Sequence, residues 1–147
     1  MIAVDTNLLV YAHRADSPWF REASGCVREL AEGGVPWAIP WPCLHEFVAV
    51  VTHPRIYAPP TSLRLARKQL EAWCASPTLV LLGEGPGHLD TLGRLLDAGQ
   101  LVGPKVHDAR VAAICLEHGV RELWTADRDF SRMPTLRTRN PLVGGGR

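Results

Sequence analysis

Acidic side chains recur in this sequence at points where predicted strands end. Asp5 directly follows the apolar run 2–4, and Asp127 follows a short strand predicted over 123–125. In an open parallel sheet, ligands bind beyond the carboxyl ends of the strands. If these two strands are neighbours, the sequence therefore predicts that the two carboxylates converge at one edge of the sheet.

Three further acids fall where they can join this pair. Asp108 lies in the first turn of a helix predicted over 106–118, and Glu46 lies on a helix predicted over 42–52, beside apolar residues. A fifth acid, Asp129, lies two positions after Asp127 in the same loop. The candidate site is therefore a carboxylate cluster that consists of Asp5, Glu46, Asp108, Asp127 and Asp129.

Carboxylates gathered in one cleft repel one another, so some of them retain protons through raised pKa values. A divalent cation removes this conflict, and oxygen ligands with open coordination positions suit Mg²⁺ or Mn²⁺. Such a metal lowers the pKa of a bound water and stabilises charge on a phosphodiester. Each acid alone could be a cap, a turn residue or a surface charge. The joint pattern predicts a metal centre for phosphodiester hydrolysis.

The elements that must position these acids alternate between strand-like and helix-like segments. Helices are predicted over 7–14, 17–32, 42–52, 61–75, 87–98 and 106–118, and strands over 2–4, 37–39, 78–82, 123–125 and 136–138. The run 78–82 is continuously apolar, which is typical of a strand buried on both faces. This alternation predicts an α/β domain with a mostly parallel sheet.

The composition fits one globular domain. The chain has 147 residues, of which 46% are hydrophobic and 21% charged, close to the globular average. We expect a single domain over 1–141 and a flexible, glycine-rich tail over 142–147. The sequence has no apolar run long enough for a membrane span and no signal peptide, so the expected location is the cytoplasm. The four cysteines have no metal-site spacing and are expected to be free thiols.

The net charge of +1 hides an uneven distribution. Without the five candidate ligands, ten acids face sixteen bases, and the last sixteen residues hold four arginines and no acid. This distribution suits a polyanionic partner, although a solvated surface explains it equally well. Four arginines near the acidic motifs are candidates for phosphate contact; they are Arg14, Arg110, Arg128 and Arg132.

Four motifs together resemble those of PIN-domain nucleases, and more narrowly of the VapC toxins of toxin–antitoxin systems. They are Val4-Asp5-Thr6-Asn7 after the first strand, Glu46 on a helix, His107-Asp108-Ala109 at a helix start, and Thr125-Ala126-Asp127-Arg128-Asp129-Phe130 near the end. Their order and spacing agree from Ile2 to about Pro141. The opening and closing motifs are fairly specific, whereas Glu46 alone is a weak signal.

This resemblance implies a PIN-like fold, with a central parallel sheet flanked by helices on both sides. It also implies that one or two Mg²⁺ or Mn²⁺ ions are held by Asp5, Glu46, Asp108 and Asp127. Asp129 is a further candidate ligand, but this position varies among such proteins. Thr6 and Asn7 would support the ligands, and Thr125 would hydrogen-bond a carboxylate or a water.

The resemblance further implies partners. Family members usually form homodimers and are silenced by a cognate antitoxin whose tail enters the active-site groove, and many cut tRNA or rRNA. We expect the proline-rich loop 54–60 to contribute to dimer or antitoxin contacts. The predicted function is therefore a metal-dependent endoribonuclease, the toxin of a type II toxin–antitoxin module.

Other functions fit the sequence less well. A non-catalytic PIN-like module that binds RNA or protein would be favoured by scattered acids or by an arginine that blocks one. DNA-directed members of the superfamily usually carry extra acids and added helices, for which this chain is short. The pair His107-Asp108 also resembles HD-type phosphohydrolases, but these are all-helical and need further histidines upstream. A receiver domain needs an aspartate after its third strand, and none lies between Glu46 and Asp90.

Overall fold

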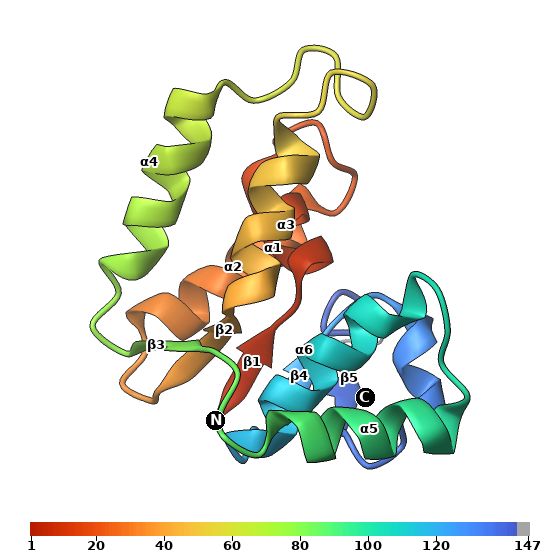
Figure 1. Cartoon of the computed structure of the whole chain (residues 1–147). Helices are drawn as coiled ribbons and strands as arrows, with labels where there is room; N and C mark the ends of the chain where they lie inside the picture. Colours follow the sequence, from red (N-terminus) through yellow and green to blue (C-terminus); the bar gives the residue numbers. More distant parts are fainter. Residues whose placement is uncertain (144–147) are drawn as a thin grey trace.

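A five-stranded parallel sheet forms the centre of the structure, a computed structural model that describes residues 1–143 (Figure 1). The strand order is β3-β2-β1-β4-β5. The strands are β1 (Ile2–Val4), β2 (Trp37–Pro40), β3 (Leu79–Leu82), β4 (Glu122–Trp124) and β5 (Thr138–Arg139). The helices are α1 (Thr6–His13), α2 (Phe20–Glu32), α3 (Trp41–Val51), α4 (Leu63–Cys74), α5 (His88–Gly99) and α6 (Lys105–Glu117), with a 3₁₀ helix η1 (Arg128–Arg132).

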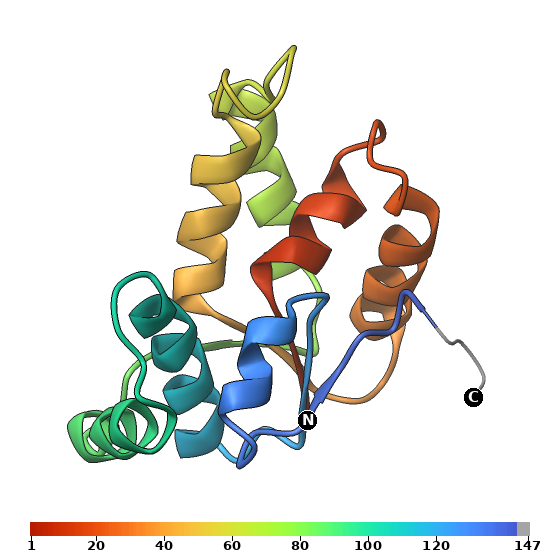
Figure 2. The same cartoon turned by 90° about the vertical axis from the view of Figure 1, so that its right-hand side faces the viewer.

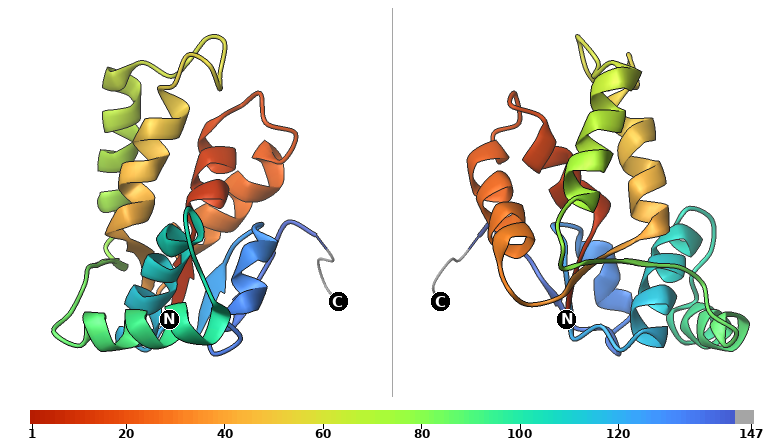
Figure 3. Two further views of the ribbon diagram at one scale, coloured as in Figure 1. Left: turned by 45° about the vertical axis from the view of Figure 1, so that its right-hand side comes forward. Right: turned by 90° about the vertical axis from the view of Figure 1, so that its left-hand side faces the viewer.

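Helices cover both faces of this sheet, as the resemblance implied. Figure 2 shows α5 and α6 on one side of the strands and α1 and α2 on the other. The pair α3 and α4 extends beyond the carboxyl ends of the strands (Figure 3). The predicted α/β fold with a parallel sheet is therefore confirmed.

The middle strand β1 determines where the first acid lies. It pairs with β2 on one side and β4 on the other, and Ala3 and Val4 are fully buried. Val4 is paired with Trp124, the last residue of β4. The two strands are parallel and end at the same level. The residues that follow them, Asp5 and Thr125, therefore lie side by side at the carboxyl ends of the strands.

Helix α6 lies deep in the molecule. It packs against α5 and also contacts β2 and η1. A helix that meets neighbours on several sides is apolar around most of its circumference. Its buried residues are accordingly small or medium-sized and apolar: Ala109, Val111, Ala112, Ala113, Ile114 and Cys115. This packing fixes the first turn of α6, which carries Asp108.

The structure corrects the sequence analysis at the edges of the sheet. The run 78–82 was predicted to be buried on both faces, but β3 is an edge strand and Val80 is 39% exposed. The strand predicted over 136–138 is the short edge strand β5, and Leu136 is buried before it begins. An apolar run alone does not distinguish a central strand from an edge strand that is covered on one face.

Residues 142 and 143 are the part of the predicted tail that the structure describes. Leu142, which the sequence analysis assigned to the tail, is buried, and its N–H donates to Asn140 Oδ1. Residues 144–147 of the predicted tail lie outside the described residues. A domain over 1–141 therefore stays a prediction. Among the helices of residues 1–143, none combines the length and apolarity that a membrane span requires.

Phe47 joins three helices and offers a test of this packing. Its ring is fully buried and lies edge-on to Trp73 of α4 and His13 of α1, with centroids 4.8 and 5.2 Å away. We expect Phe47→Ala to lower the free energy of unfolding by about 3–5 kcal/mol, because it leaves a cavity. Val80→Ala, at an exposed position, should cost less than about 1 kcal/mol. Urea denaturation of both variants checks this; equal losses would contradict it.

Candidate metal centre

Asp5 is buried where β1 passes into α1, and four donors converge on its carboxylate. Oδ1 accepts from the N–H of Thr6 at 2.8 Å and from the thiol of Cys43 at 3.5 Å. Oδ2 accepts from the hydroxyl of Thr125 at 2.7 Å and from the side-chain amide of Asn7 at 3.4 Å. Burial raises the pKa of this carboxyl group, and the hydrogen bonds from Thr125, Thr6 and Cys43 oppose the rise. Asp5 thus caps α1 and has a fixed orientation.

The hydroxyl of Thr125 connects this carboxylate to the next acid. It donates to Asp5 and accepts from the Asn7 side-chain amide at 3.2 Å and from the Asp127 N–H at 3.0 Å. The side-chain oxygen of Asn7 accepts from the Ala126 N–H at 3.0 Å. This network ties the start of α1 to the loop after β4, two segments more than one hundred residues apart in sequence.

Three of the predicted ligands lie within reach of a single ion. Asp108, Asp127 and Asp129 each offer one oxygen, and these three oxygens lie within 4.8 Å of one another. Asp127 also caps η1, because its Oδ1 accepts from the Asp129 N–H at 2.8 Å. Asp129 is exposed, and one of its oxygens lies 3.8 Å from the ammonium of Lys105.

The other two acids border the same space. One hollow of about 360 Å³ is bordered by Asp5, Glu46, Asp108 and Asp127, and a second of about 290 Å³ shares the first three of these. Glu46 is exposed on α3, and Phe47 beside it is buried, so the packing of α3 sets the direction of the Glu46 side chain. The structure therefore brings four of the predicted acids around one space, and it places Asp129 beside two of them, Asp108 and Asp127.

The pKa of Asp108 reflects the proximity of these acids. Its pKa is raised to about 6, first by partial burial and then by the charges of Asp127, Asp5, Asp129 and Glu46. The four other acids thus all act on one carboxyl group, which is the repulsion that the sequence analysis expected.

The donor set suits a hard divalent cation. Every candidate ligand atom is a carboxylate oxygen, and a cation would relieve the repulsion that raises the pKa of Asp108. Thr6 also borders the first hollow, and its buried hydroxyl has no hydrogen-bond partner within residues 1–143. Buried polar groups are generally satisfied by protein, water or ion, so the residues present fit a hydrated metal site.

Sequence reasoning missed several residues around the acids. Tyr57 lies in the loop that was expected to contact partners, yet it borders the first hollow together with Tyr11. Lys105 and the thiol of Cys43 were also missed, since neither belongs to a recognisable motif. The contacts of Tyr57 and Cys43 are non-local, so no pattern along the chain could have found them.

Two of the arginines considered for phosphate contact already have partners. Arg14 forms an ion pair with Asp16 at 2.7 Å, and Arg110 forms one with Glu84. Both guanidinium groups therefore have their charge balanced by a nearby carboxylate.

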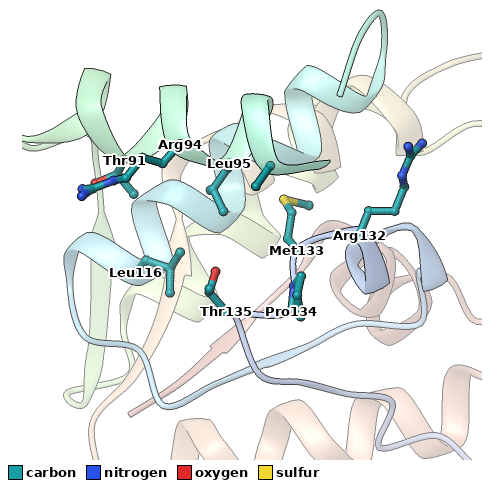
Figure 4. Close-up of a pocket in the computed structure, with 9 residues that line it drawn as sticks. Thr91, Arg94, Leu95, Leu116, Arg132, Met133, Pro134 and Thr135 are labelled. Carbon is teal, nitrogen blue, oxygen red and sulfur yellow. The ribbon is translucent and has the colours of Figure 1, made fainter. Parts of the chain in front are cut away.

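A separate cavity, shown in Figure 4, is bordered by none of the five acids. It has a volume of about 450 Å³ and is bordered by α5, by Leu116 of α6 and by residues 132–135. Its lining is mainly apolar, with Arg94 and Arg132 among its border residues and no carboxylate. Its chemistry differs from that of the acidic space, and the candidate metal centre does not include it.

Fold and site together define a class of protein. A family model described as "PIN domain" matches residues 2–136. The fold is similar to that of VapBC2 from Rickettsia felis, solved with a promoter DNA fragment (TM-score 0.69, 20% identity, 95% of this chain and 98% of that chain). It is also similar to VapC20 from Mycobacterium tuberculosis, described as a sarcin-ricin loop cleaving toxin (TM-score 0.67, 16% identity, 90% and 95%). The chain belongs to the PIN-domain family.

Sequence relatives narrow this class. The chain is 37% identical over 144 residues to ribonuclease VapC43 of M. tuberculosis and to VapC ribonuclease Mb2897 of Mycobacterium bovis, across 98% of this chain and 97% of each relative. It is 31% identical over 141 residues to ribonuclease VapC48 of M. tuberculosis, across 95% and 97%. Within the PIN-domain family, the chain therefore belongs to the VapC ribonuclease toxins of toxin–antitoxin systems.

The Thr125 hydroxyl is the centre of the network, and its removal tests the account. We expect Thr125→Val to lower the free energy of unfolding by about 1–3 kcal/mol, because it leaves the Asp127 N–H and the Asn7 amide without their acceptor. Thr125→Ser keeps the hydroxyl, so its free energy of unfolding should fall clearly less than that of Thr125→Val. Urea denaturation of both variants provides the measurement, and a valine variant as stable as the serine variant would argue against the network.

The raised pKa of Asp108 predicts a pH dependence in metal-free protein. Because the folded-state pKa of about 6 exceeds the ordinary 3.8, the folded state takes up the proton first, so stability rises as pH falls through 6 and stops rising near 3.8. With allowance for solvent screening, the melting temperature in EDTA should rise by about 2–4 °C more between pH 7 and pH 5 in the wild type than in Asp108→Asn. Identical pH profiles would contradict this.

Proposed function

We propose that this VapC protein is a Mg²⁺- or Mn²⁺-dependent endoribonuclease whose active site is the space between the five acids. The observation that carries the proposal is the convergence of the acids: Asp108, Asp127 and Asp129 offer oxygens within 4.8 Å of one another, and Asp5 and Glu46 border the same hollow as Asp108 and Asp127. A repulsive cluster with only oxygen donors would attract a divalent cation strongly.

The five acids would have different roles in metal binding and catalysis according to where they lie. Asp108, Asp127 and Asp129 have oxygens close enough to share one ion, and Asp5 and Glu46 border the same space. When bound, the metal would supply a water of lowered pKa and a positive charge beside the phosphodiester. Asp5 is held by four donors, so it would keep its orientation, while the exposed Glu46 would hold a water or a proton at the rim.

Thr6, Asn7 and Thr125 would act by positioning the acids. Asn7 and Thr125 hold Asp5 and the loop that carries Asp127 through side-chain hydrogen bonds. Thr6 acts on Asp5 through its backbone N–H, and its unpaired hydroxyl would bind a water of the metal.

The RNA substrate, the antitoxin and the dimer partner of this chain are also proposals. VapC20, a structural neighbour, is described as cleaving the sarcin-ricin loop, and other neighbours were solved as toxin–antitoxin complexes. We infer that this chain cuts a structured RNA, tRNA or rRNA, in the cytoplasm, and that a cognate antitoxin silences it. A homodimer would be consistent with this type II arrangement.

The non-catalytic alternative is less well supported. It required scattered acids or an arginine that blocks one. Instead four of the acids border one space and the fifth lies beside two of them, and among the described residues no arginine forms an ion pair with any of the five. The nearest cation, Lys105, lies 3.8 Å from Asp129, the most peripheral of them.

Incubation of the purified protein with total cellular RNA tests the proposed activity. We expect discrete fragments with Mg²⁺ or Mn²⁺ and none with EDTA. Asp108→Asn should lower the cleavage rate by roughly 100-fold or more, equivalent to about 2.7 kcal/mol of transition-state stabilisation. Asp97→Asn, an exposed acid on α5, is the matched control and should cleave like the wild type.

Two outcomes would contradict the proposal. A folded wild-type protein that cuts no RNA with either metal would favour the binding module. Cleavage that persists in Asp108→Asn would mean that the carboxylates are assigned wrongly or that the activity is a contaminant.

A further inference from the structure

The first hollow has an aromatic side as well as an acidic one. Besides the four carboxylates it is bordered by Tyr11 of α1 and by Tyr57 of the loop between α3 and α4. The second hollow is bordered by His45, His107 and Arg110, and by no tyrosine, phenylalanine or tryptophan. The acids therefore separate an aromatic side from a basic side.

The ring of Tyr57 is held in place by Arg14. The guanidinium carbon lies 4.2 Å from the ring centroid, as in a cation–π contact. Arg14 is itself fixed, because it donates twice to Asp16, at 2.9 and 2.7 Å, and once to the Thr61 hydroxyl at 3.2 Å. One face of the Tyr57 ring is thus covered by the guanidinium group, and the residue also borders the hollow.

Thr61, which accepts the hydrogen bond from Arg14, is itself held by contacts with buried parts of the structure. Thr61 is buried, and its hydroxyl lies 3.1 Å from His13 Nε2, while His13 Nδ1 lies 2.9 Å from Gln69 of α4. The backbone of Tyr57 is held as well, since its N–H donates to the His53 carbonyl at 3.1 Å. An exposed loop therefore presents an ordered, half-buried ring beside a cluster of acids.

We propose that Tyr57, with Tyr11 beside it, forms a stacking site for one unpaired base of the RNA, next to the phosphodiester at the acids. The proposal rests on the proposed ribonuclease function and adds to it a contact between the protein and one base. Unstacked bases in single-stranded segments of RNA are commonly held on aromatic side chains. The hollow of about 360 Å³ has the size of a small-ligand site.

A base-stacking role differs from a backbone-binding role in what it recognises. Every base has a π-face, so the site tolerates different bases but needs a base. An oligonucleotide with the same ribose-phosphate backbone and no bases would therefore not use Tyr57. The charge of Arg14 is balanced by Asp16, so this side of the hollow offers stacking more than charge.

Binding assays in the uncleaving Asp108→Asn background test the proposal. The probes are a fluorescein-labelled single-stranded RNA 12-mer of mixed sequence and the corresponding abasic 12-mer. Tyr57→Leu and Tyr57→Ser should weaken binding of the RNA by about 10-fold and leave binding of the abasic oligonucleotide unchanged. Tyr57→Phe keeps the π-face and should restore most of the affinity. Ile56→Ala, an exposed neighbour on the same loop, is the matched control.

The outcomes separate this inference from the proposed function. Equal RNA affinity for the leucine, serine and parent proteins would overturn the stacking site, as would an equal loss with both oligonucleotides. Metal-dependent cleavage by wild type with no effect of Tyr57 would leave the ribonuclease proposal standing alone. Tyr57-dependent RNA binding without any cleavage would support the stacking site and remove the catalytic proposal.

Discussion

The mutual repulsion of five carboxylates near the carboxyl ends of the strands is the constraint on which the structure of this protein depends. Burial, with a smaller contribution from the charge of Glu46, raises the pKa of Asp5, and the neighbouring acids contribute to the raised pKa of Asp108. A cluster of this kind opposes folding unless other contacts hold it. Those contacts are the donors from Thr6, Thr125 and Cys43, together with the packing of the helices that carry the remaining acids.

The elements that hold the cluster come from all parts of the chain. The parallel register of β1 and β4 places Asp5 beside Thr125, and the burial of α6 on several sides fixes Asp108. Phe47, packed between α4 and α1, holds the part of α3 that carries Glu46. Buried strands and helices thus hold a group of side chains that repel one another, which is a local conflict of the kind expected at functional sites.

Local sequence patterns predicted the segments that carry the acids because their signals are local. Asp5 follows an apolar strand, Asp108 opens a helix, and both features can be identified from neighbouring residues. The strand order is not local, which is why the apolar run at β3 was taken for a strand buried on both faces although it lies at the sheet edge. Tyr57 could not be found from sequence either. Its place beside the acids depends on how the loop after α3 folds back, held by Arg14 and Thr61.

The central claim, that the repulsion between these acids is relieved by one shared cation, is tested most directly by calorimetric titration with Mn²⁺. Titration at pH 6 in two buffers of different ionisation enthalpy counts the protons released. A ligand whose pKa is about 6 is half-protonated there and must lose its proton to bind metal, so about half a proton should leave per protein, falling toward zero at pH 8. In Asp108→Asn the share of this release that comes from Asp108 should be lost, so fewer protons should leave than in the wild type. Millimolar Mn²⁺ that does not bind, or that binds without proton release at pH 6, would contradict the account.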